Sequence, residues 1–341
     1  MRTSTFAVRG IRISVNQSRS PTPTDVQQAD VFSGVPFAEP PVGPLRFERP
    51  LPIAAYTNLR DCSSSAAIPS CYKQGAAASD GSEDCLKLII YRPSGLKPFV
   101  RLPVLIYIHG GGFVTGDANW IAPPNNYGFI DFYVSQHIVV VEIQYRLALL
   151  GFGSDGTSQI PGNLGLFDQR LALHWVGENI AAFNGDPSIV TLWGESAGSA
   201  SVAYQTIDSV SSQYFHQAIQ ISGSFSAPWA EPMGANRSVD STLQVAKFLG
   251  CNESAELKSC LKRATIADLL NAVKKISLMQ TDFSLLCFGP TFDGDFVRQN
   301  ITFAQAIEKV EPKSTLHGFM SDEVVGWSEY LCNKSNVRIK V

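Results

Sequence analysis

The chain has 341 residues and a formal net charge of −3, with 17% charged and 45% hydrophobic residues. This length is enough to bury a large core, and the charge gives no basic footprint for binding nucleic acid. The sequence contains no apolar run of membrane-spanning length, and its first residues lack the apolar segment of a signal peptide. We therefore expect a globular protein without a nucleic-acid partner or a transmembrane segment.

Predicted strands and helices alternate along the chain. Short apolar runs predict strands at 104–108, 138–143, 189–193 and 218–221. A helix is expected over Asp168–Asn179, and the alternation is typical of a doubly wound, mostly parallel sheet. From 228 to 272 the sequence becomes helical, which predicts a cap inserted within a single domain that covers residues 1–341.

A glycine-rich loop follows the first predicted strand directly. It runs His109-Gly110-Gly111-Gly112-Phe113. Consecutive glycines let backbone N–H groups turn toward a developing oxyanion, as acyl transfer requires. The alternative is a dinucleotide-binding loop, but Thr115 stands where that fingerprint needs its third glycine, and no acidic residue follows at the required spacing. No organic cofactor is expected.

The stretch Gly194-Glu195-Ser196-Ala197-Gly198 fits a nucleophile elbow. The apolar run Ser188–Trp193 predicts a strand before it, and Ala197–Ile207 predicts a helix after it. This pattern mounts Ser196 on a tight turn at a helix N-terminus, where the helix dipole favours negative charge. The alternative is an ordinary turn of glycine and serine.

With these motifs the chain resembles the type-B carboxylesterase/lipase family, which includes cholinesterases and fungal lipases. Other blocks that resemble the family occur in its order: Phe32–Phe47, Ser82–Leu88, Tyr145–Phe152 and Pro161–Gln169. The resemblance implies the α/β-hydrolase fold and hydrolysis of small-molecule or lipid esters without a metal or cofactor. The rival hypothesis is a non-catalytic, esterase-like module for adhesion or binding, a class that usually loses the nucleophile.

The resemblance also implies the roles of the site residues. Ser196 would attack the ester carbonyl, and the N–H groups of Gly111, Gly112 and Ala197 would hold the oxyanion. Glu323 would be the acid that orients the catalytic histidine.

Two points about the triad stay open at this stage. Asp322 is the alternative to Glu323 as the acid. In the family the histidine follows the acid, whereas all five histidines precede Glu323, and His109 is expected to brace the glycine loop. We therefore expect a member without its C-terminal part, inactive or weakly active as it stands.

The chain has seven cysteines, and their spacing does not suggest a metal site. The resemblance implies that Cys85 pairs with Cys71, with Cys62 as the alternative, and that Cys251 pairs with Cys260. The opposing hypothesis is that all seven are reduced thiols. Disulfides and sequons together favour an extracellular protein, the sequons lying at Asn16, Asn236, Asn252, Asn300 and Asn333.

Overall fold

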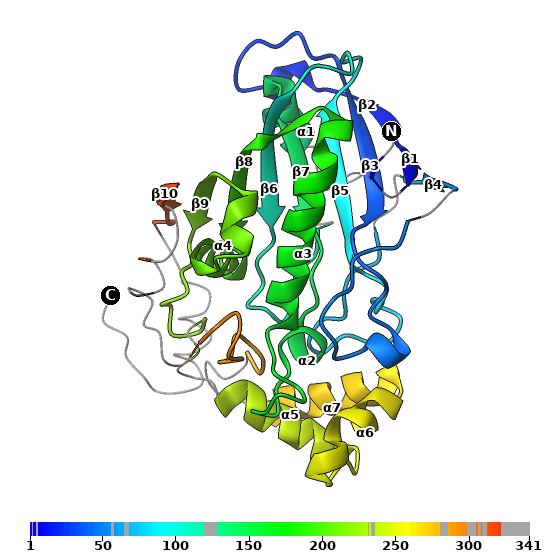
Figure 1. Cartoon of the computed structure of the whole chain (residues 1–341), viewed down its shortest axis with the longest axis vertical. Coiled ribbons are helices and arrows are strands. Elements are labelled where there is room, and N and C mark those ends of the chain that lie inside the picture. Colours follow the sequence, from blue (N-terminus) through cyan, green and yellow to red (C-terminus); the bar gives the residue numbers. More distant parts are fainter. Residues whose placement is uncertain are drawn as a thin grey trace.

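The computed structural model describes residues 6–55, 58–64, 68–118, 128–230, 236–279, 286–298 and 312–321, together with positions 1, 3, 4, 232, 305 and 308. These residues form an eight-stranded sheet in the order β10-β9-β8-β6-β7-β5-β3-β2 (Figure 1). Its strands are β2 Ile11–Ser14, β3 Gln28–Pro36, β5 Lys87–Pro93, β6 Leu102–Ile108, β7 Val139–Ile143, β8 Gly185–Glu195, β9 Gln217–Ile221 and β10 Ser314–Gly318. A second sheet pairs β1 (Ala7–Arg9) with β4 (Leu59–Asp61).

The sheet is parallel on one side and antiparallel on the other. Strands β6 to β10 run parallel to one another, whereas β2 pairs with β3, β3 with β5 and β5 with β7 in antiparallel fashion. This mostly parallel mixed sheet agrees with the expected α/β-hydrolase fold. Ile108, Gly194 and Gln220 lie side by side, so β6, β8 and β9 end together at one edge.

Helices cover both faces of the sheet, and the side chains of each strand alternate between the two cores. Val104, Ile106 and Ile108 of β6 belong to the larger core beneath α3 (Leu164–Asn179) and α4 (Ala197–Ile207). The intervening Leu105 and Tyr107 belong to the core beneath α1 (Gly128–Phe132). A parallel sheet that is buried on both faces needs strands that are almost continuously apolar. For this reason the apolar runs of the sequence predicted the central strands.

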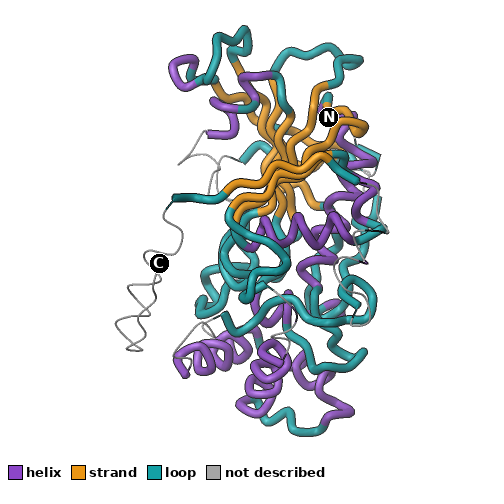
Figure 2. Tube along the Cα trace, turned by 90° about the vertical axis from the view of Figure 1, so that its left-hand side faces the viewer, coloured by secondary structure: helices purple, strands orange, loops and turns teal. Residues whose placement is uncertain are grey.

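The remaining helices lie beyond the sheet. The helices α5 (Asn236–Phe248), α6 (Leu257–Arg263) and α7 (Ile266–Met279) gather at one end of the molecule, with α2 (Ala148–Phe152) between them and the sheet (Figures 1 and 2). Short 3₁₀ helices occur at Gln17–Arg19, Gly43–Leu45, Val134–Gln136, Ile180–Phe183, Ser211–Tyr214 and Ser254–Glu256. The segment 228–272 is thus largely helical, and its role as a cap over the site stays a prediction.

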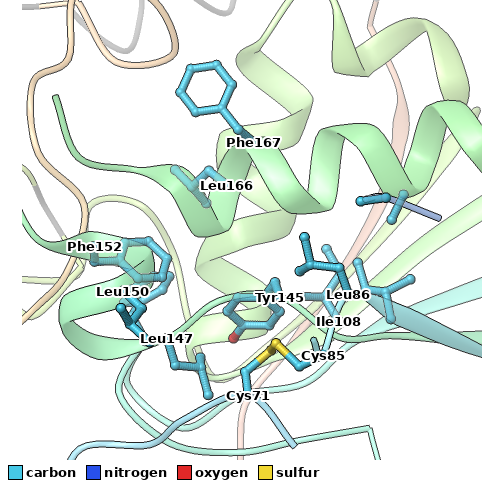
Figure 3. Close-up of a cluster of buried hydrophobic side chains, with 14 of the residues drawn as sticks. Cys71, Cys85, Leu86, Ile108, Tyr145, Leu147, Leu150, Phe152, Leu166 and Phe167 are labelled. Atoms are coloured by element: carbon cyan, nitrogen blue, oxygen red, sulfur yellow. A yellow bond between two sulfur atoms is a disulfide. The ribbon is translucent and has the colours of Figure 1, made fainter. Parts of the chain in front are cut away.

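Two disulfides join the expected cysteines. Cys71 is bonded to Cys85, with the two Cα atoms 5.1 Å apart, and the bridge packs beside the buried ring of Tyr145 (Figure 3). Cys251, which follows α5, is bonded to Cys260 of α6. Each bridge closes a short loop and contributes about 2–3 kcal/mol, chiefly by constraining the unfolded chain.

Glu142 is a carboxyl group inside the sheet. It lies on β7 with 1% of its surface exposed, and its Oε2 accepts a hydrogen bond of 2.5 Å from the hydroxyl of Tyr91. Within the part of the chain that the structure describes, Oε1 has no partner. Burial raises the pKa of Glu142 well above its ordinary value and so favours the neutral, protonated form of this side chain.

Candidate active site

Ser196 occupies the single-residue turn between β8 and α4. The strand ends at Glu195 and the helix begins at Ala197, so Ser196 alone makes the turn. Its backbone has φ 54° and ψ −121°, a conformation that residues with a side chain rarely adopt. The N–H of Ser196 donates to the carbonyl of Ile221 in β9, at 2.9 Å, which ties this strained turn to the sheet.

The glycines around Ser196 are required by close backbone contacts. A Cβ on Gly194 would lie 2.2 Å from the carbonyl oxygen of Gly198, and one on Gly198 would lie 2.0 Å from that of Ile108. In the loop after β9, a Cβ on Gly223 would lie 2.1 Å from the carbonyl oxygen of Ser196. These contacts are far too short for real atoms, so the elbow exists only because glycine occupies all three positions.

The glycine loop after β6 lies directly against the elbow. A Cβ on Gly110 would be 3.0 Å from the Cβ of Ser196 and 2.7 Å from the carbonyl oxygen of Glu195. Gly111 and Gly112 have φ of 107° and 62°, in the range that favours glycine. The structure therefore brings together Ser196, Ala197 and the glycine loop, the elements expected to form the oxyanion site.

His109 braces this loop from within the core. Its ring is 3% exposed and stacks on Tyr145, with the ring centroids 4.4 Å apart. Its Nδ1 lies 2.9 Å from the carbonyl oxygen of Gly110, and the hydroxyl of Tyr145 donates to the carbonyl of His109 at 2.8 Å. Burial lowers the pKa of His109 to about 4, so the imidazole is neutral at pH 7.

The other four histidines lie away from the glycine loop, and three of them have partners of their own. The ring nitrogens of His137 and His174 face carboxylates on the surface, at 2.7 Å and 3.5 Å. Nδ1 of His216 accepts a hydrogen bond from a backbone N–H of β8, and His317 is exposed on β10. Among the described residues, no histidine forms a hydrogen bond with the hydroxyl of Ser196.

The expected acid, Glu323, and its alternative, Asp322, lie outside the described residues. The strand that leads toward them is described, and it ends beside the elbow. The N–H of Ser222 donates to the carbonyl of Gly318, the last residue of β10, at 2.9 Å. The role of Glu323 as the acid stays a prediction. In the sequence Glu323 follows shortly after Gly318, where β10 is bonded to Ser222.

Sequence reasoning missed Ser222. This residue has φ 56°, and its hydroxyl is buried without a partner in the described part of the chain. It follows Ile221, whose carbonyl holds the N–H of Ser196. The sequence signal was the Ser-Gly-Ser stretch at the end of a strand, but the positive φ of Ser222 cannot be inferred from that stretch.

Leu286 stands over the glycine loop. A Cβ on Gly112 would lie 2.6 Å from a methyl group of Leu286. The neighbouring Phe288 has none of its surface exposed and packs in the larger core. The side chain of Leu286 therefore lies directly against Gly112.

In the described residues, no group of three or more histidine, cysteine, aspartate or glutamate side chains is placed to hold a metal ion. A helix long and apolar enough to cross a membrane is likewise absent from the described ranges.

Comparison with known proteins gives the same family as the motifs. Residues 2–340 match the Carboxylesterase family. The chain belongs to this family. It is 37% identical to gut esterase 1 of Caenorhabditis briggsae, over 86% of the chain and 51% of that protein. It is 36% identical to the cholinesterase of Mus musculus, over 88% of the chain and 51% of that protein.

A third relative differs in its named activity. The medium-chain fatty acyl-CoA hydrolase precursor of Anas platyrhynchos is 35% identical, over 82% of the chain and 50% of that protein. The relatives that match this chain thus carry names of different activities. The chain spans about half the length of these curated relatives.

Proposed function

We propose that this carboxylesterase-family chain carries the nucleophile of a serine esterase. The observation that supports this most directly is the strained turn at Ser196, whose Cβ lies against the glycine loop. Strain of this kind amounts to about 1–3 kcal/mol and persists where function uses it. A non-catalytic binding module has no need for such a turn, so the intact elbow favours the enzyme over the module.

The proposed reaction is acyl transfer through Ser196. Its Oγ attacks the ester carbonyl, a histidine takes the hydroxyl proton, and the N–H groups of Gly111, Gly112 and Ala197 stabilise the oxyanion. The alcohol leaves with that proton, and water then hydrolyses the acyl-enzyme by the same route. Glu323 orients the histidine and stabilises its charged form. A small-molecule or lipid ester is the proposed substrate.

We infer that the histidine lies outside residues 1–341. The surroundings of the five histidines support that inference, since His109 is buried and neutral, three others are bonded to groups away from Ser196, and His317 is exposed on β10. Without the base, both acylation and deacylation are slow, because general-base assistance is worth about 10²–10⁴-fold. Residues 1–341 alone should therefore turn over esters very poorly while still carrying the nucleophile.

The experiment follows acylation and turnover separately. The chain is incubated with p-nitrophenyl butyrate, and peptide mass spectrometry locates butyrate on serine. The Ser196→Ala variant is compared with Ser188→Ala, a control at the exposed opposite end of β8. We expect butyrylation at Ser196 with little multiple turnover. No butyrylation of Ser196 would contradict the proposed function, and fast turnover lost only in Ser196→Ala would place the base among the five histidines.

We also propose an oxidising, extracellular compartment for the protein. The two disulfides support this, because such bonds persist where thiols are not kept reduced. Peptide mapping without reductant, on protein isolated from its source, should recover both bridges. Free thiols at Cys85 and Cys251 would contradict the proposed compartment.

A further inference from the structure

Arg237 is a half-buried cation at the start of α5. It lies in the first turn of α5, and one Nη donates to the carbonyl of Trp229 at 3.0 Å. Its Nε is buried and makes no hydrogen bond. Within the described ranges, no carboxylate forms an ion pair with this guanidinium.

The surroundings of Arg237 make its positive charge unfavourable. The first turn of α5 contains no acidic residue, so the positive end of the helix dipole adds to the charge of the guanidinium. Burial disfavours the charged form of the guanidinium and so lowers the pKa of Arg237. Charged groups placed in such an environment are normally paired with an opposite charge.

The position of Arg237 connects it to the glycine loop. A Cβ on Gly289 would lie 3.0 Å from the Nη2 of Arg237 and 3.9 Å from the ring of Phe113. Phe113 follows Gly112 directly, and its ring faces Trp229 with the centroids 6.2 Å apart. The guanidinium and the ring of Phe113, the residue that follows the glycine loop, therefore both lie next to Gly289.

A fixed support holds this arrangement. The hydroxyl of Ser238 donates to the carbonyl of Gly289 at 2.9 Å and accepts from the N–H of Gly289 at the same distance. The hydrogen bond from Nη2 to the carbonyl of Trp229 holds the guanidinium beside Gly289. A cation held in this way is preorganised for an anion, because little conformational freedom remains to be lost on binding.

We propose that Arg237 recognises a carboxylate carried by the ester substrate, so that the preferred substrates are anionic half-esters of dicarboxylic acids. This rests on the proposed function, since the carboxylate is recognised while the ester lies at Ser196. The anion supplies the partner that the guanidinium and the N-terminus of α5 lack. Neutral esters of the same length leave the charge unpaired and bind more weakly.

The test measures binding rather than turnover, in a Ser196→Ala background. The ligands are the monomethyl esters of adipic, suberic and sebacic acid and the matching neutral dimethyl esters, titrated by calorimetry. We expect at least one anionic half-ester to bind about tenfold more tightly than its neutral diester, as a charge-assisted hydrogen bond gives. Arg237→Gln should remove this preference, and Arg237→Lys should keep part of it.

The control substitution is Arg263→Gln, on an α6 arginine whose side chain is 65% exposed. It should leave the preference unchanged, and melting curves should establish that each variant folds. Equal affinity for half-ester and diester, no binding of either, or a preference that survives Arg237→Gln would each overturn the proposal. Because no turnover is measured, these outcomes are separate from the acylation assay that tests Ser196.

Discussion

Replacing His109 should change how stability depends on pH. The imidazole has its ordinary pKa of 6.5 in the unfolded chain and a pKa of about 4 in the folded protein. The folded state therefore binds fewer protons between these values. The contribution of His109 to stability is complete above pH 6.5 and is lost progressively as the pH falls toward 4.

The size of the effect follows from those two values. Between pH 7.5 and pH 5, titration of His109 should lower the free energy of unfolding by about 2 kcal/mol. His109→Gln cannot titrate, so this part of the pH dependence should disappear. The variant should also be less stable at pH 7.5, because it loses the stacking on Tyr145.

Urea unfolding at the two pH values measures this difference. His317→Gln is the matched control, since His317 lies exposed on β10 and should leave the pH dependence unchanged. If wild type and His109→Gln lose the same free energy of unfolding between pH 7.5 and pH 5, the buried neutral imidazole is the wrong description of this loop. The reasoning about its bracing role would then fail with it.

Three further outcomes are expected. The folded pKa of Glu142 is raised, so its contribution to stability is lost as the pH rises. The free energy of unfolding of Glu142→Gln, measured in urea, should therefore rise relative to wild type between pH 5 and pH 8. A difference that stays constant over this range would contradict the prediction. Gly198→Ala should destabilise by roughly 3 kcal/mol or more in thermal melts, since its Cβ meets a backbone oxygen at 2.0 Å; an unchanged melting temperature would refute this. Replacing Cys251 and Cys260 by serine should remove about 2–3 kcal/mol, and unchanged urea midpoints would speak against the bridge.

The central parallel strands and the elbow could be predicted from the sequence because their signals are local. The apolar run before Ser196, the glycines beside it and the small residues after it define the end of β8 and the whole of α4. In contrast, β2 and β3 were not predicted as strands, because polar residues interrupt their apolar runs.

The parts of the site that sequence reasoning missed depend on tertiary contacts. The strained backbone of Ser222 is set by hydrogen bonds between β9, β10 and the elbow. Whether Arg237 is exposed or buried depends on Gly289 and Trp229, which come from other segments. Composition and periodicity carry no information about such contacts, so only the folded chain reveals them.

The end of β10 has a consequence for local opening of the protein. Among the described strands it lies at the outer position of the sheet, where fraying requires the least free energy. When β10 separates, the N–H of Ser222 loses its acceptor at Gly318, whereas the hydrogen bond from Ser196 to Ile221 of β9 remains. Exchange of the amide hydrogen of Ser222 should therefore follow the separation of β10 from the sheet. Exchange of the amide hydrogen of Ser196 should report the rarer event in which β9 also separates.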